Sequence, residues 1–385
     1  MFADRTKWNL EANRLAQSLA RLRAAGAPIL GLTASNPTEC GFHYDSQVIL
    51  SALSNPDALH YDPDPRGLAS ARQAVAAYYS PRSRNLLIED IFLTTGTSEA
   101  YSFVFRLLSN PGDEILIPAP GYPLFELLAD LLDVKLVRYP LLYDHAWQID
   151  FHSLERALTH RSRAIVVVHP NNPTGHFANA QEVSRLNEIC SARGLALIAD
   201  EVFLDFALDA PPRPSFVANS PSLTFTLSGI SKISGLPQMK AAWIIASGPE
   251  HLKKDAVARL EVIADSYLSM NAPIQLALPA FLDLRKNFQQ QLIARVRKNL
   301  AALDRLMSAQ KICSRLDIEG GWYVILRVPA IRSDEDLAVE LLEQKNVHVH
   351  PGHFYDFSIA GFLVASLITR EDTFQAGIQR LLSIF

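Results

Sequence analysis

The sequence predicts an α/β fold in which a large, mainly parallel sheet is covered by helices on both faces. Three observations lead to this prediction. Short apolar segments recur between residues 91 and 246, segments of helical periodicity alternate with them, and glycine or proline turns separate the two kinds. Near-continuous apolar strands are typical of sheets buried on both faces, and their alternation with helices is typical of parallel sheets.

The elements of this region follow one another in a regular order along the chain. Turns at 95–97, 111–113 and 118–123 contain the glycines and prolines that separate them. Strands are expected at residues 91–94, 114–117, 134–139, 164–169, 195–199, 223–227 and 241–246. Helices are expected at residues 98–108, 124–132, 153–158 and 181–193.

The flanking segments differ in character from this alternating region. Leucines at near-helical spacing predict a helix at 9–25, a short strand follows at 29–32, and another helix begins near Leu68. The segment 252–307 is predominantly helical, with an interruption at 269–273. The last part predicts strands at 322–328, 347–350 and 361–367 and helices at 335–344 and 372–382. We therefore expect a large domain at residues 46–275 and a smaller α+β domain formed by residues 1–45 and 276–385.

Composition excludes several classes of protein. The 385 residues are 49% hydrophobic and 20% charged, and a net charge of -4 argues against a nucleic-acid-binding or anionic-membrane-binding surface. Cys40, Cys190 and Cys313 lie too far apart to suggest a disulfide framework or a cysteine metal site. The N-terminus has no apolar signal region, and no segment is apolar for long enough to span a bilayer. We expect a soluble cytoplasmic protein.

Four places near predicted strand ends are suited to binding a ligand, because the carboxyl ends of parallel strands form a crevice. Thr97 and Ser98 open a helix whose N-terminus can bind an anion such as phosphate. Asn172 lies in a rigid turn, and Asp200 follows an apolar strand that would partly desolvate its carboxylate. Lys232 lies on a turn of small residues, as a reactive amine would. Taken alone, each of these four places also fits an ordinary helix cap, salt bridge or solvated lysine. Their combination in one chain is what predicts a ligand-binding site.

Together these stretches resemble the fold-type I pyridoxal-phosphate enzymes, specifically the class I/II aminotransferases. The resemblance covers nearly the whole chain. It implies a fold-type I aminotransferase with a cofactor-binding large domain, and it implies a homodimer. The segments that carry it are GTSEA at 96–100, PGDEILIPAPGYP at 111–123, HPNNPTG at 169–175, ADEVF at 199–203 and SKISGLPQMK at 231–240.

The resemblance also implies pyridoxal 5'-phosphate as cofactor, with a role for each matched residue. Lys232 would hold the cofactor as a Schiff base and move a proton at the substrate's Cα. Asp200 would pair with the pyridinium nitrogen, Asn172 would donate to the phenolic oxygen, and Tyr122 would stack on the ring. The phosphate would be surrounded by Gly96, Thr97, Ser98, Ser231 and Lys240, with Tyr61 reaching it across the dimer interface.

The sequence departs from the family pattern around the cofactor. Phe203 stands where most members have a tyrosine that hydrogen-bonds the phenolic oxygen, which predicts a raised pKa of the Schiff base. Lys240 stands where an arginine is usual, so the charge is kept without the bidentate fork. Gly229 replaces a frequent serine, whose part would fall to Ser228 or Ser231.

A further departure concerns the substrate. Val364 occupies the place of the arginine that usually grips the α-carboxylate, and Arg370 is the nearest replacement. Asn36, Trp322 and His353 are the other predicted substrate contacts. The histidines in segment 348–353 also suggest a metal site, but no acidic or cysteine ligands accompany them, so we predict no metal.

The leading hypothesis is an aminotransferase that moves an amino group from an amino acid to a 2-oxo acid. A β-lyase or other carbanion chemistry with the same cofactor is the alternative that the missing arginine leaves open. A non-catalytic cofactor-binding homologue is a more remote alternative. A hydrolase with Ser98 as nucleophile is also conceivable, because residues 96–100 resemble a nucleophile elbow, but Ala100 replaces the motif's second glycine.

Overall fold

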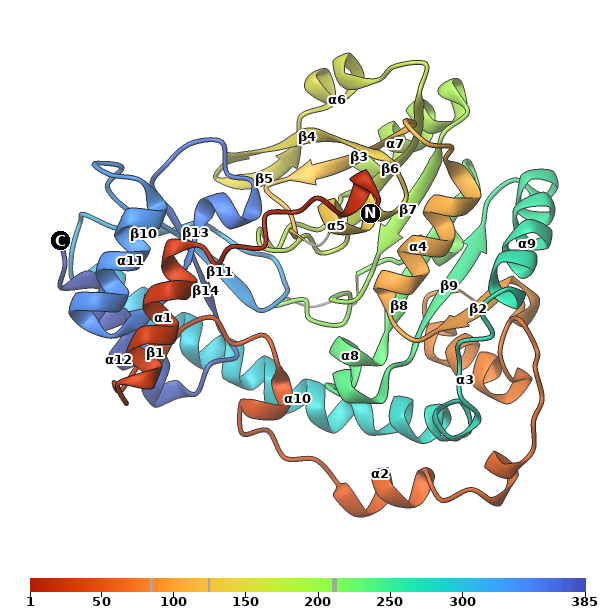
Figure 1. Cartoon of the computed structure of the whole chain (residues 1–385), viewed down its shortest axis with the longest axis horizontal. Coiled ribbons are helices and arrows are strands. Elements are labelled where there is room, and N and C mark those ends of the chain that lie inside the picture. The colour runs from red at the N-terminus through yellow and green to blue at the C-terminus, as the bar shows by residue number, and fades with distance from the viewer. Residues whose placement is uncertain (84–85, 124, 210–212) are drawn as a thin grey trace.

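The computed structural model describes residues 1–83, 86–123, 125–209 and 213–385, and its centre is an eight-stranded sheet (Figure 1). The spatial order is β2-β9-β8-β7-β6-β3-β4-β5. Only β9 and β5 run against the other strands, so the sheet is mainly parallel, as predicted. The strands are β2 (Ile91–Thr94), β3 (Glu114–Ala119), β4 (Lys135–Asp144), β5 (Ala146–Ile149), β6 (Ser162–Val168), β7 (Ala196–Asp200), β8 (Thr224–Gly229) and β9 (Ala242–Ser247).

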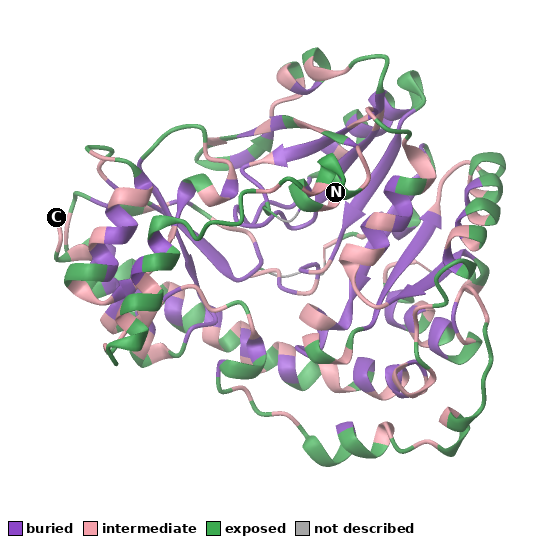
Figure 2. Cartoon of the chain, viewed as in Figure 1, coloured by how far each residue is buried: buried purple, intermediate pink, exposed green. Residues whose placement is uncertain are grey.

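Helices cover both faces of this sheet because alternate residues of each strand point to opposite sides. Val166 of β6 packs into a core with α4, α5 and α9, whereas Val167 packs with α7 on the other face. At the β2 edge, Ile91 packs with α3 and α10. Figure 2 shows the strands as mostly buried. The helices are α3 (Ala69–Tyr79), α4 (Thr97–Leu108), α5 (Phe125–Leu131), α7 (Ala180–Arg193), α9 (Glu250–Asp265) and α10 (Ala272–Ser308).

A second, four-stranded antiparallel sheet has the order β10-β11-β14-β13. The N-terminal segment joins this part, because β1 (Leu30–Gly31) pairs with β12 (Val347–His348), and Arg14 of α1 forms an ion pair with Asp336 of α11. The predicted domain boundaries at 45 and 275 stay a prediction, and α10 continues across residue 275. The elements are β10 (Ser314–Arg315), β11 (Tyr323–Arg327), β13 (His350–Pro351), β14 (Phe362–Ser366), α1 (Arg14–Ala24), α11 (Asp334–Lys345) and α12 (Glu371–Leu382).

Some elements differ from the sequence prediction for local reasons. The first helix begins at Arg14 and not at residue 9, because the Asn13 side chain accepts the Ala16 N–H and caps it. Asn271 caps α10 in the same way, which places the predicted interruption between α9 and α10. Residue 124 of the predicted helix 124–132 lies outside the described residues. The structure adds the β4–β5 hairpin and α2 (Ser46–Ala52). The helix predicted at 153–158 is α6 (Phe151–Ala157), which begins two residues earlier.

No helix among the described residues is both long and apolar enough to cross a membrane.

Candidate active site

A cavity of about 450 Å³ lies at the carboxyl ends of β6, β7 and β8. The four-stranded sheet closes part of it, since Tyr323 of β11 and His350 of β13 also line it. The structure thereby brings together most of the predicted cofactor residues. Those that line the cavity are Gly96, Thr97, Ser98, Tyr122, Asn172, Asp200, Phe203, Ser231, Lys232 and Lys240.

Lys232 lies on α8 (Ile230–Ile233), the short helix that directly follows β8. Its Nζ is 5.1 Å from the ring centroid of Trp322 and 6.0 Å from that of Phe203. Burial lowers the pKa of Lys232, and the charge of Asp200 only partly opposes this. A lowered pKa increases the neutral fraction of the amine, which is the form that acts as a nucleophile.

The backbone before Lys232 explains the glycine at position 229. A Cβ on Gly229 would lie 2.8 Å from the Cβ of Ala242 on the neighbouring strand, so a serine does not fit without a shift. Ser228 is fully buried, and its Oγ donates to the carbonyl of Glu201 at 3.2 Å. Ser231 lines the cavity, which makes it, and not Ser228, the available hydroxyl.

Asp200 ends β7 and is 8% exposed. The Tyr101 hydroxyl donates to its Oδ2 at 2.9 Å, and the Val202 N–H donates to its Oδ1 at 3.1 Å. Burial nevertheless raises the pKa of Asp200 to about 6. A carboxyl group in such surroundings is stabilised as the anion by a cation, and a protonated ring nitrogen is suited to that role.

Tyr101 is a positioning residue that the sequence analysis missed. It lies on α4, one helical turn after Thr97, and is buried against the sheet. The only sequence signal is this i, i+4 spacing, which places both side chains on one face of the helix. Nothing in the sequence shows that this face meets the end of β7.

The Asn172 turn is held by buried hydrogen bonds. The Asn171 side chain donates to the Pro120 carbonyl and to Thr174 Oγ1, both at 3.0 Å. Gly175 has a φ of +71° and packs so closely that a Cβ there would lie 2.6 Å from the Gly320 carbonyl oxygen. The buried Oδ1 of Asn172 bonds to no described residue. Buried polar atoms normally have a partner, so this acceptor is suited to a hydrogen-bond donor of a group bound in the cavity.

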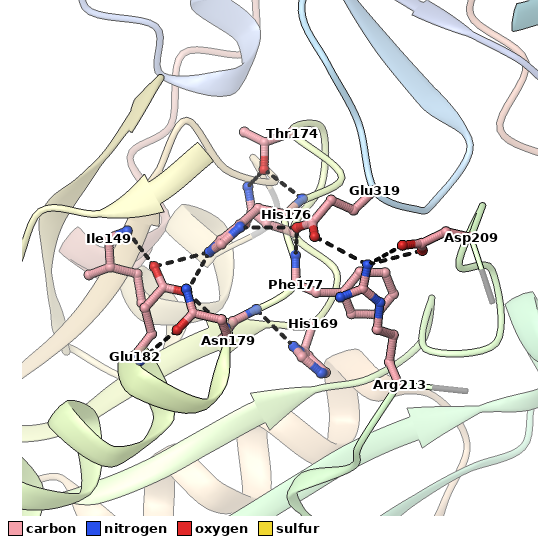
Figure 3. Close-up of polar contacts among 12 residues, drawn as sticks. Ile149, His169, Thr174, His176, Phe177, Asn179, Glu182, Asp209, Arg213 and Glu319 are labelled. Carbon is pink, nitrogen blue, oxygen red and sulfur yellow. Dashed lines mark hydrogen bonds and ion pairs between the residues drawn. The ribbon is translucent and has the colours of Figure 1, made fainter. Parts of the chain in front are cut away.

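An ion network surrounds His176, which directly follows this turn in the sequence (Figure 3). His176 lies between Glu182 at 3.0 Å and Glu319 at 3.4 Å, and Glu319 also contacts Arg213 at 3.2 Å. Burial alone would lower the pKa of His176, but the hydrogen bonds and charges of the two glutamates outweigh it and raise the pKa to about 9. Because Glu319 lies three residues before Trp322, the network ties the Asn172 turn to the segment that carries Trp322.

This network predicts a pH-dependent contribution to stability. The pKa of His176 rises from 6.5 to about 9 on folding, so the contribution is fully present below pH 6.5 and is lost as the pH rises through 9. We expect His176→Gln to lower the free energy of unfolding by about 3 kcal/mol at pH 6 and by much less at pH 10. Urea unfolding at both pH values, with the fully exposed His145→Gln as control, measures this. An equal loss at both pH values would contradict it.

The anion-binding end of the cavity is the N-terminus of α4. Gly96 at the cap position provides no side-chain cap, which leaves the first N–H groups of the helix available to an anion. The Nζ of Lys240 lies 3.6 Å from where a Gly96 Cβ would be. An amine beside a helix N-terminus is suited to a phosphate, so the donor set of the cavity fits pyridoxal 5'-phosphate at both ends.

Comparison with known proteins agrees with this geometry. The sequence profile described as "Aminotransferase class I and II" matches residues 28–373. The chain belongs to this family. A glutamate-pyruvate aminotransferase of Haemophilus influenzae is 30% identical over 339 residues, which are 85% of this chain and 83% of the relative. An alanine aminotransferase of Mycobacterium tuberculosis is 28% identical over 95% of this chain and 87% of the relative.

A solved structure shows the same fold over the full length of this aminotransferase. An aminotransferase from Escherichia coli superposes with a TM-score of 0.87 at 25% identity and covers 100% of this chain and 98% of its own. The family, the fold class and the transaminase activity predicted from the sequence are thus confirmed.

The predicted substrate contacts of this aminotransferase are only partly brought to the cavity. The Asn36 side chain instead accepts the Thr38 N–H and donates to Glu39, which caps a short 3-10 helix. Ser35 lines the cavity in its place. Trp322 is fully buried and does not itself line the cavity, but it contacts two residues that do, Lys232 and Phe203.

The remaining predicted residues lie elsewhere on the chain. His353 is exposed and outside the cavity, whereas the next residue, Phe354, lines it. Arg370 lies in a separate surface groove with Arg295. Tyr61 is 76% exposed and lines another pocket. Among the described side chains, no three His, Cys, Asp or Glu residues are placed to hold a metal ion.

Proposed function

We propose that this aminotransferase uses pyridoxal 5'-phosphate, held by Lys232, Asp200, Asn172 and the N-terminus of α4, to move an amino group between an amino acid and a 2-oxo acid. The observation that carries the proposal is that Lys232, with a lowered pKa, and the buried Asp200 line one cavity. When bound, the cofactor supplies an electron sink for negative charge at the substrate's Cα.

The residues of this chain perform the remaining tasks. Lys232 moves a proton between the substrate's Cα and the cofactor's C4′ carbon. The lowered pKa of Lys232 favours this role, because it increases the neutral fraction of the amine that accepts the proton. Asp200 holds a proton on the ring nitrogen, and Tyr101 keeps the carboxylate in place. The buried rings of Phe203 and Trp322 exclude water around Lys232.

The names of the relatives support alanine and glutamate as amino donors, with pyruvate and 2-oxoglutarate as acceptors. Incubation of the purified protein with a panel of amino acids and these two acceptors tests this. A new amino acid, formed only when an acceptor is present, is the expected product. Release of ammonia and a keto acid without an acceptor would support lyase chemistry instead.

We also propose a homodimer in which Tyr61 reaches the cofactor phosphate of the neighbouring subunit. The exposure of Tyr61, and of Leu59 at 94%, supports this, because apolar side chains of that size favour burial at an interface. A cytoplasmic location is part of the same proposal, and the free thiols of Cys40, Cys190 and Cys313 suit a reducing compartment.

Phe203 should affect the spectrum of the bound cofactor. It is 4% exposed and packs edge-on against Trp322 at 4.9 Å, so its ring offers no hydrogen bond to the phenolic oxygen. We expect Phe203→Tyr to lower the pKa read from the cofactor's visible absorbance by about 1. A spectral pH titration of both proteins measures it, and an unchanged or raised pKa in the variant would refute the role given to this position.

A further inference from the structure

The four-stranded sheet β10-β11-β14-β13 forms a wall of the cavity that contains hydrogen-bonding groups. Tyr323 and His350 come from its strands, and Tyr355 comes from the turn that follows β13. Among the described residues that line the cavity, the only lysines or arginines are Lys232 and Lys240. Lys240 lies at the anion-binding end, and Lys232 is the proposed cofactor attachment point. An unpaired buried carboxylate is strongly unfavourable, so a substrate carboxylate needs neutral hydrogen-bond donors, and the four-stranded sheet contributes several polar side chains to the cavity.

His350 stands next to the position where the sequence led us to expect an arginine. In the antiparallel pairing of β13 and β14, His350 is directly opposite Val364. Directly opposite residues place their side chains on the same face of a sheet. Val364 is 1% exposed and offers no polar atom, whereas His350 lines the cavity. The imidazole is thus the nearest polar side chain that the strand pairing provides on this face.

The ring of His350 is held in a defined orientation. Its Nδ1 lies 3.1 Å from the hydroxyl of Tyr355. The Tyr355 carbonyl accepts the Gly121 N–H at 2.9 Å, which links the wall to the segment before Tyr122. When the Tyr355 hydroxyl donates to Nδ1, a neutral imidazole carries its proton on Nε2.

The other ring nitrogen is available to a ligand. No described residue forms a hydrogen bond with Nε2 of His350. The nearest titratable ring besides Tyr355 is that of His348, with centroids 6.0 Å apart. Burial, reinforced by His348, lowers the pKa of His350 to about 4, so the imidazole is neutral near neutral pH. The hydrogen bond from the Tyr355 hydroxyl to Nδ1 is what places the proton of this neutral ring on Nε2.

We propose that His350 binds the carboxylate of the amino acid and of the 2-oxo acid through Nε2–H, with Tyr355 as its positioning residue. The inference rests on the proposed aminotransferase function and names the residue that recognises its substrates. A single neutral donor binds a carboxylate less tightly than a bidentate guanidinium. We therefore expect His350 to contribute to the affinity for every amino acid and 2-oxo acid that the enzyme binds.

The test measures binding of propionate, and of its neutral isostere propionamide, to the cofactor-loaded protein by calorimetry. His350→Leu removes the donor, and His350→Gln keeps an N–H donor at a similar distance from the backbone. His145→Leu, at a fully exposed site, is the matched control. We expect the Leu variant to weaken propionate binding about tenfold or more, since hydrogen bonds to charged groups are worth at least that much. The Gln variant and the control should stay within about threefold of wild type, and propionamide binding should change little in all of them.

Two outcomes overturn the inference. Equal propionate affinity in wild type and the Leu variant excludes His350 as the carboxylate donor. A Gln variant as weak as the Leu variant shows that the shape of the imidazole, and not its hydrogen bond, is what matters. Visible absorbance reports cofactor loading of every protein. A wild type that does not load overturns the proposed function, whereas a loaded set with equal affinities overturns only the inference about His350.

Discussion

Lys232→Ala should abolish amino transfer, with kcat lower by about 10⁴-fold or more, because it removes both the nucleophile and the base that serves the substrate's Cα. The geometry leaves no substitute nearby. Phe203 and Trp322 surround the Nζ of Lys232, and the other described lysine of the cavity, Lys240, lies at the anion-binding end.

A chemical readout separates this role from a loss of folding. Borohydride treatment followed by mass spectrometry should locate the cofactor on the Lys232 peptide of the wild type and on no peptide of the variant. Lys298→Ala, at an exposed surface site, serves as the control for activity and thermal stability. Retained labelling in the Lys232 variant would move the attachment point to another lysine.

Asp200→Asn should produce opposite effects on activity and on stability. The variant keeps the shape of the side chain but cannot hold a proton on the ring nitrogen, so we expect kcat to fall by about 10²- to 10⁴-fold. Folding raises the pKa of Asp200 from 3.8 to about 6, so the folded chain binds this proton more tightly than the unfolded chain. The free energy of unfolding of the cofactor-free wild type therefore falls as the pH rises from 4 to 6. Above that range the ionised, buried carboxylate keeps it at this lower value.

The cofactor-free Asp200→Asn variant should accordingly be more stable than wild type by about 3 kcal/mol at pH 8 and nearly equal to it at pH 4. Chemical unfolding at the two pH values measures the difference. Tyr101→Phe is the companion variant, since it removes one hydrogen bond to the carboxylate and leaves the charge. A destabilised Asn variant at pH 8 would show that the carboxylate already has a compensating partner in the cofactor-free chain.

The sequence could predict the sheet and the cofactor end of the site because both depend on local order. Asp200 and Lys232 each lie at or just after the end of an apolar strand, and parallel strands bring such ends together. Gly96 and Asn172 belong to turns whose composition is itself distinctive. Local sequence patterns are therefore enough to predict these residues as part of the cofactor site, without knowledge of which distant segments contact one another.

The substrate end could not be predicted in the same way, because it depends on which strands pair. His350 gains its importance from lying opposite Val364, a register that no local pattern indicates. The sequence predicts Asn36 as a substrate contact, yet its side chain has a local partner in the Thr38 N–H, as asparagine before a short helix often does. Arg370 lies beyond the end of β14, at the start of α12, and this places it outside the cavity.

The charge balance around His176 limits how this part of the chain can change in evolution. One imidazolium lies between two carboxylates, and Glu182 is 5% exposed, so a neutral residue at position 176 would leave Glu182 without a cation. Loss of the histidine therefore becomes tolerable only together with loss of the Glu182 charge. In homologous sequences, positions 176 and 182 should change as a pair, whereas Glu319 keeps Arg213 as a partner when the histidine is lost and need not change with it.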